Sequence, residues 1–280
     1  MAIENSYIPF SQRAGLEPIP PQLKLGEVSN ELRRQIVYFI SLEIDRETTF
    51  GYSSNYFEDK WMRVAMDLHV LFFERDAGTF QNDTEALKEF LMAFLRRATI
   101  GKLFDLVEFF IRHPKCSDEL KGDLANSFVT ARAAYRILDH HIVAIGTQEQ
   151  AEAFERAMED AEEKNAGAAR KHMMEAGLAL RNSDWASSIR ESINAVEAIA
   201  VRLAPGTHTL GPALAALENK GHLHGGLKAA FGSLYGFSSD EEGIRHALVF
   251  KKEAQVDEAD ALFMLGACAS FVSYLLARAN

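Results

Sequence analysis

The sequence predicts an all-α protein with two helical domains, and three observations support this prediction. Proline, which interrupts helices, is absent between Pro21 and Pro114 and again between Pro114 and Pro205. Within these tracts apolar residues recur at intervals of three and four, as they do along one face of a helix. Alternation with a period of two, which is typical of strands, is scarce. We therefore expect helices that pack on helices, with little or no sheet.

The first long helix is predicted to begin after a helix cap. Ser29 stands at the cap position, and Leu32, Ile36 and Ile40 follow at helical spacing. Turn-forming residues and aromatics in residues 45–56 predict a loop. Further helical patterns in this half of the chain cover residues 61–72, 87–95, 103–111 and 120–138.

A cluster of acidic residues marks the expected join between the domains. Residues 149–163 contain seven carboxylates and one basic residue, Arg156, with alanines between them. Such a composition is typical of a solvated helix. We therefore predict an N-terminal domain over residues 1–150 and a C-terminal domain over residues 151–280, with residues 151–165 as a helical connector.

The C-terminal half is predicted to hold a second set of helices. Two of the stops between them are supplied by Pro205-Gly206 and by Lys220-Gly221. The expected helices cover residues 167–181, 185–203, 210–219, 223–234, 240–250 and 256–278.

Composition and charge exclude several classes of protein. The chain has 280 residues, of which 48% are hydrophobic, and a formal net charge of -10. The apolar residues are numerous enough to form a core, which excludes a disordered protein. The negative charge repels polyanions, which excludes extended DNA binding. Any nucleic-acid site must therefore be a local patch. The chain begins without signal-peptide features and no apolar run approaches a membrane span, so we expect a cytoplasmic protein without membrane contacts.

No cofactor or metal is expected from the motifs. Cys116 and Cys268 are far apart and lack partners at ligand spacing, which is typical of reduced core thiols. His222 and His224 could offer two metal ligands, but the stretch around them does not complete a site. The sequence also lacks a P-loop, a Gly-rich Rossmann fingerprint, G-x-S-x-G and H-E-x-x-H.

A polar stripe runs along the helix predicted for residues 185–203. Ser187, Arg190, Asn194 and Glu197 recur at intervals of three and four beside the apolar face. One interpretation is a solvent-exposed face on which Arg190 contacts Glu197 or Asn194. The other is that Asn194 and Glu197 point into a cleft, where they orient a proton-transferring group.

The stretch most suggestive of chemistry is the pair Arg245-His246. It follows two overlapping S-x-x-E patterns, Ser238 with Glu241 and Ser239 with Glu242, which predict a capped helix start. An arginine can hold a phosphate by a forked contact, and a histidine can move a proton near neutral pH. The alternative is a pair of solvated or salt-bridged side chains.

Several motifs in order resemble the C-terminal domain of AbiJ-type abortive-infection proteins, which belongs to the HEPN superfamily. These motifs lie in residues 182–197, in Thr209-Leu210-Gly211 and in residues 235–247, the last of which ends in Gly243-Ile244-Arg245-His246-Ala247. The first part of the chain resembles an AbiJ-type N-terminal domain through residues 10–16, Leu32-Arg33 and residues 61–73.

The resemblance implies an all-α bundle that forms a homodimer and cleaves RNA without metal at the dimer cleft. In HEPN ribonucleases an arginine is followed by a polar residue and, four to six residues after the arginine, by a histidine. Arg245 and His246 match the first two positions, but none of Phe250, Lys251 and Lys252 is a histidine, and no histidine follows His246. Two functions therefore stay open: a ribonuclease effector of phage defence, or a non-catalytic HEPN-like dimer that binds RNA, a nucleotide or a protein.

Under the ribonuclease hypothesis, each site residue has an expected role. His246 and its symmetry mate would serve as base and acid, while Arg245 holds the phosphate. Glu197 and Asn194 would orient this pair. Substrate RNA would be bound by Arg190, Lys251 and Lys252, although the two lysines also suit a solvated helix end.

Overall fold

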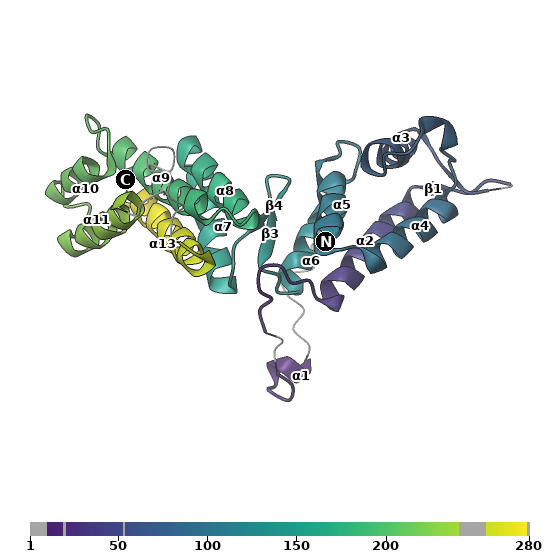
Figure 1. Cartoon of the computed structure of the whole chain (residues 1–280), viewed down its shortest axis with the longest axis horizontal. Coiled ribbons are helices and arrows are strands. Elements are labelled where there is room, and N and C mark those ends of the chain that lie inside the picture. The colour runs from purple at the N-terminus through teal and green to yellow at the C-terminus, as the bar shows by residue number, and fades with distance from the viewer. Residues whose placement is uncertain (1–9, 19–20, 53, 241–255, 279–280) are drawn as a thin grey trace. The chain divides into compact units, whose positions relative to one another are not determined.

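Helices make up most of the chain, which confirms the all-α class. The structure is a computed structural model that describes residues 10–18, 21–52, 54–240 and 256–278. The chain divides into two compact units, Met1–Ile142 and Val143–Asn280. Strands in the described residues are confined to two short two-stranded sheets (Figure 1).

The described residues of the first unit include six α-helices, and four of these begin at a polar side-chain cap. Side chains of Ser29, Asp83, Thr99 and Ser117 each accept a hydrogen bond from a backbone N–H in the first turn of α2, α4, α5 and α6. The elements are α1 (Phe10–Arg13), α2 (Asn30–Arg46), β1 (Thr48–Thr49), β2 (Tyr56–Phe57), α3 (Asp59–Asp67), the π-helical η1 (Leu68–Phe72), the 3-10 helix η2 (Ala77–Thr79), α4 (Thr84–Arg97), α5 (Ile100–Arg112), α6 (Asp118–Thr130) and β3 (Tyr135–Leu138).

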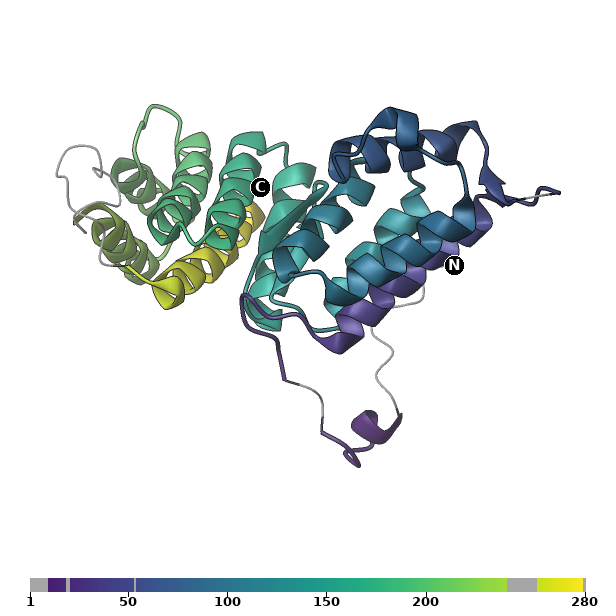
Figure 2. The same cartoon turned by 45° about the vertical axis from the view of Figure 1, so that its right-hand side comes forward.

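Aromatic rings fill the core of this unit. Trp61 is buried between Phe57 and Phe110, with ring centroids 5.4 and 6.2 Å apart. The apolar residues expected on one face of α2 are buried as well, Leu32, Ile36 and Ile40 among them. Stacked and edge-on rings of this kind add to the free energy gained by burial. The two helices α2 and α4 lie side by side (Figures 1 and 2).

Two segments of the first unit differ from the expected pattern. Part of the predicted loop at residues 45–56 is strand instead. The strand β1 lies within this segment and pairs with β2 as a short hairpin. The helix predicted for residues 120–138 ends at Thr130, because Arg132 adopts φ 51° and the Ala133 N–H bonds to the Phe128 carbonyl, which is a Schellman ending. Residues after it form β3, which pairs with β4 (His141–Ala144) through a two-residue turn.

The turn between β3 and β4 explains why a hairpin forms where a helix was expected. Asp139 and His140 both have positive φ, 47° and 62°. Positive φ at both central residues is the mark of the tight hairpin turn whose twist matches antiparallel strands. Apolar periodicity alone does not reveal this turn.

The second unit is a helical bundle built around one central helix. Its helices α8, α10 and α9 have the bounds expected from the sequence, and α9 contacts α8, α13, α10 and α11. Gly206 and Gly221, at φ 89° and 75°, lie at the two expected stops. The elements are α7 (Gln148–Glu163), α8 (Gly167–Arg181), α9 (Trp185–Leu203), α10 (Leu210–Asn219), α11 (Gly225–Asp240) and α13 (Glu258–Ala277).

The acidic segment is a packed helix of this bundle rather than the solvated connector expected at residues 151–165. Its apolar stripe contacts α13 and α8, and Gln150 Nε2 donates to the Leu262 carbonyl at 3.0 Å. Alanines at helical spacing let neighbouring helices approach closely, and the carboxylates between them hid this stripe in the composition. The buried residues are Ala151, Phe154, Ala157, Met158 and Ala161.

The prediction of a helix start near Ser238 is wrong for the residues that the structure describes there. Residues Ser238 and Ser239 belong to α11, which continues to Asp240. Ser238 is fully buried, and its hydroxyl donates to the Tyr235 carbonyl at 2.9 Å instead of capping a first turn. Serine can satisfy its hydroxyl inside a helix in this way, so the S-x-x-E pattern is ambiguous. Residues 241–250 of the helix predicted there lie outside the described residues.

The helix α13 departs from the expectation that no apolar run approaches a membrane span. By length and composition alone, Glu258–Ala277 could cross a membrane. In the structure α13 packs against α9, α7 and α8, and it buries Met264, Leu265, Cys268 and Val272. A helix that is apolar on most sides is typical of a bundle core as well as of a membrane.

Replacing Phe154 with alanine should destabilise the second unit. Phe154 is fully buried in α7, so its removal leaves a cavity and should lower the free energy of unfolding by about 3–5 kcal/mol. Urea denaturation followed by circular dichroism measures this. The control is Glu159→Gln in the exposed face of α7, expected within about 0.5 kcal/mol of the wild type. Equal effects of the two changes would contradict the packing of α7.

Candidate functional site

Only some of the residues expected to form the site lie in the part of the chain that the structure describes. Arg245, His246, Lys251 and Lys252 all lie outside the described residues. Arg190, Asn194 and Glu197 lie on α9, in the second unit. These three and Ser187 are half-buried and form the stripe expected beside the buried apolar face.

Arg190 belongs to a polar cluster between α8 and α9. Its Nη2 donates to Ser187 Oγ at 2.9 Å, and its Nε lies 3.4 Å from Glu191 Oε1. The other oxygen of Glu191 lies 2.7 Å from His172 Nδ1 on α8. We call His172, Ser187, Arg190 and Glu191 the α8–α9 cluster.

The α8–α9 cluster places an imidazole and a guanidinium on the same carboxylate, that of Glu191. A carboxylate next to an imidazole orients the ring, and a guanidinium can bind an anion. His172 was missed at the sequence level, because it comes from another helix and stands in no recognisable motif. Only the pairing of α8 with α9 brings it next to Glu191.

Glu197 has a structural partner within the bundle. Its Oε2 accepts a hydrogen bond of 2.9 Å from the backbone N–H of Leu210, the first residue of α10. The cap residue Thr209 makes no side-chain bond of its own, so Glu197 satisfies this N–H from a different helix. The structure thus joins two of the motif segments, residues 182–197 and Thr209-Leu210-Gly211.

The two histidines considered as metal ligands contact the backbone. His222 Nδ1 lies 3.2 Å from the Arg278 carbonyl, and His224 Nδ1 accepts from the Gly226 N–H at 3.1 Å. Across the described ranges, no group of three or more His, Cys, Asp or Glu residues is placed to hold a metal ion.

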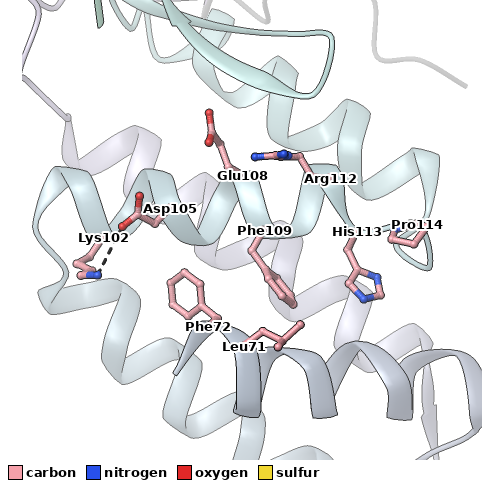
Figure 3. Close-up of a pocket in the computed structure, with 9 residues that line it drawn as sticks. All are labelled: Leu71, Phe72, Lys102, Asp105, Glu108, Phe109, Arg112, His113 and Pro114. Carbon is pink, nitrogen blue, oxygen red and sulfur yellow. Dashed lines mark ion pairs between the residues drawn. The ribbon is translucent and has the colours of Figure 1, made fainter. Parts of the chain in front are cut away.

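The first unit has an open pocket of about 480 Å³ between α5 and η1 (Figure 3). Phe109 points from α5 towards Leu71 of η1, which forms the apolar floor. The carboxylates that line the pocket are engaged: Asp105 lies 3.6 Å from Lys102 Nζ, and Glu108 Oε1 accepts from the Ile142 N–H at 2.8 Å. The pocket is therefore of mixed charge, with acids that already have partners.

Neither cysteine has the character of a nucleophile. Complete burial raises the pKa of the Cys268 thiol to about 12. Burial, with a smaller contribution from the carboxylate of Glu43, raises the pKa of Cys116 to about 12 as well. Since the thiolate is the reactive form, both groups are inert at neutral pH.

We expect the thiol reagent DTNB to label neither cysteine quickly in the folded protein at pH 8. At that pH an unburied thiol, with a pKa of about 8.5, is partly ionised, whereas Cys116 and Cys268 stay protonated. Unfolding in urea should release two reactive thiols per chain. A thiol that reacts within seconds in the native protein would show that one of them is exposed.

Comparison with known families identifies the N-terminal part of the chain. A family model described as AbiJ N-terminal domain 4 matches residues 9–160. Comparisons with curated proteins and with solved structures give no match. The family match includes the described helices of the first unit and most of α7. It covers more than half of the 280 residues, and the chain therefore belongs to the AbiJ N-terminal domain 4 family.

Proposed function

We propose that this protein is an abortive-infection effector of phage defence whose C-terminal unit is a HEPN-type endoribonuclease. The membership in the AbiJ N-terminal domain 4 family supports the abortive-infection role. The ribonuclease role is supported by the resemblance of residues 182–247 to HEPN motifs and by the helical bundle around α9. The protein is proposed to act in the cytoplasm, without metal or cofactor.

The observation that carries this proposal is the position of the Arg245-His246 pair between α11 and α13. Both of these helices contact α9, which presents the half-buried polar stripe with Arg190 and Asn194. In the sequence, residues 241–255 therefore connect two helices that both pack on α9. A site shared by the pair and the stripe is consistent with this connectivity.

The proposed reaction is a transesterification of RNA. His246 takes the proton of a 2′-hydroxyl, the 2′-oxygen forms a bond to the adjacent phosphorus, and the bond from phosphorus to the 5′-oxygen breaks. His246 of the partner subunit gives a proton to the departing 5′-oxygen. Arg245 stabilises the negative charge on the phosphoryl oxygens. The products are a 2′,3′-cyclic phosphate and a 5′-hydroxyl.

The residues of α9 are proposed to support this chemistry. Asn194 and Glu197 orient the Arg245-His246 pair, and the bond from the Leu210 N–H fixes one oxygen of the Glu197 carboxylate. Arg190, Lys251 and Lys252 bind the RNA backbone. Ser187 and Glu191 hold the guanidinium of Arg190 in place.

A second function is favoured by one departure from the HEPN pattern. No histidine follows His246, so the second histidine of the family motif is missing. The alternative is therefore a non-catalytic HEPN-like dimer that binds RNA, a nucleotide or a protein. Incubation of the purified protein with total RNA distinguishes the two, because only the ribonuclease yields fragments with cyclic phosphate ends.

The proposed cleft requires two copies of the chain. A single Arg-His pair supplies one proton-transfer group, whereas the reaction uses an acid and a base. Light scattering should therefore give twice the chain mass of 31.2 kDa. A monomer at micromolar concentration that still cleaves RNA would rule out the shared cleft.

Substitutions in the Arg-His pair test the catalytic role. His246→Ala should slow RNA cleavage by about 10²–10⁴-fold with folding intact, the usual range for a positioned acid or base. Arg245→Ala should also slow it, and Arg245→Lys should not restore it fully, because an ammonium lacks the planar fork. The matched control is His208→Ala, an exposed histidine of the same unit. Wild-type cleavage by folded, dimeric alanine variants would refute the nuclease proposal.

A further inference from the structure

A basic groove runs along the surface of the first unit between α2 and α4. Its volume is about 650 Å³. Arg33 and Arg34 on α2 and Arg96 on α4 lie along it, and none of its lining residues is acidic. We call this the α2–α4 groove. It is lined by Asn30, Arg33, Arg34, Val37, Tyr38, Ser41, Met92 and Arg96.

The three guanidinium groups have spare binding capacity. Arg34 and Arg96 are exposed, and neither forms an ion pair with any residue that the structure describes. Arg33 is half-buried, and its Nη1 donates to the Leu95 carbonyl near the end of α4. This bond fixes the Arg33 fork beside the groove and leaves its other N–H donors for a ligand.

The positive charge of the groove contrasts with the chain as a whole, which has a net charge of -10. At the far end of the same two helices, Lys88 is paired with a carboxylate, since its Nζ lies 2.6 Å from Asp45 Oδ1. Three arginines in a groove whose lining includes no acidic residue indicate an anionic ligand. Arginine is suited to phosphate, because its planar fork binds two oxygens at once.

An aromatic ring lies in the same groove. Tyr38 is 59% exposed although it is a large ring on a well-packed helix, and its neighbour Phe39 contacts it edge-on with centroids 5.1 Å apart. An exposed ring among arginines is the arrangement by which proteins bind unpaired bases, with stacking on the ring and phosphates on the cations. An acidic peptide would form ion pairs with the arginines but would not account for the exposed ring of Tyr38.

The length of the groove suits several nucleotides. Its residues on α2 extend from Asn30 to Ser41, which is about 17 Å at 1.5 Å per residue. That length spans about five phosphates at the 3.4 Å spacing of a stacked strand. We propose that the α2–α4 groove binds a single-stranded nucleic acid, with phosphates on Arg34 and Arg96 and a base stacked on Tyr38.

This proposal is independent of RNA cleavage by the second unit. The test therefore uses ligands that cannot be cleaved: a labelled 2′-O-methyl RNA of about 12 nucleotides, a length typical for such sites, and DNA of the same sequence. Fluorescence anisotropy with the full chain at low salt measures the dissociation constant for each. The two ligands distinguish contacts with the backbone and bases, which both share, from contacts with the sugar.

We expect the variant with Arg34→Ala and Arg96→Ala to bind at least about tenfold more weakly. Two lost phosphate contacts should also reduce the slope of log affinity against log salt by about 1.4. Tyr38→Ala should weaken binding about 5- to 150-fold through the lost stack, whereas Tyr38→Phe, which keeps the ring, should bind as the wild type does. The control is Arg112→Ala, which removes an arginine of the other pocket in the same unit.

The outcomes separate this groove from the proposed catalytic cleft. Loss of binding in the groove variants, with full binding by His246→Ala, supports the groove whether or not the protein cleaves RNA. Wild-type affinity in the double variant refutes it. Equal losses in Arg112→Ala also refute it, and so does tighter binding of a duplex of the same sequence, added as a third ligand, because either result would indicate nonspecific attraction to charge.

Discussion

Burial of the apolar face of α9 is the interaction on which the second unit depends. Ile189, Ile193 and Val196 are completely buried, and each contributes about 1.5–3 kcal/mol by leaving water. Because α8, α10, α11 and α13 all contact this helix, its orientation determines the positions of the others. The polar stripe beside this face is consequently held half-buried, with Arg190 and Glu197 both engaged by neighbouring groups.

Electrostatics in this chain is a matter of local arrangement. With a net charge of -10, the whole molecule repels nucleic acids, so binding must rest on places where cations stand without neutralising acids. The α2–α4 groove is such a place in the first unit, whereas the pocket of Figure 3 carries acids that already have partners. Whether nearby acids neutralise the cations therefore distinguishes a surface that can bind phosphate from one that is only solvated.

The two proposals assign different tasks to the two units. Chemistry is proposed for the second unit, around Arg245 and His246, and capture of a single strand is proposed for the α2–α4 groove of the first. Strand capture does not require the second histidine that the HEPN pattern calls for, so it is compatible with the ribonuclease and with the non-catalytic alternative. The family match itself covers the first unit, which is where the groove lies.

The sequence by itself determined the all-α class and many helices, because apolar spacing and polar caps are local signals. The expected bounds of α8, α9 and α10 agree with the structure, and Ser29 caps α2. The N-terminal family resemblance was also visible in the sequence. The hairpin formed by β3 and β4 was not visible, because left-handed backbone at Arg132 and His140 ends the helical pattern without a glycine or proline to mark it.

Only the tertiary structure decided which polar residues meet. The contact between His172 and Glu191 depends on the pairing of α8 with α9, and the bond from Leu210 to Glu197 depends on the path of the chain into α10. The α2–α4 groove likewise combines residues about 60 positions apart. The packed role of α7 was hidden because alanine contributes little to an apolar pattern yet allows close helix contact. Local sequence encodes helices, whereas long-range packing determines the sites between them.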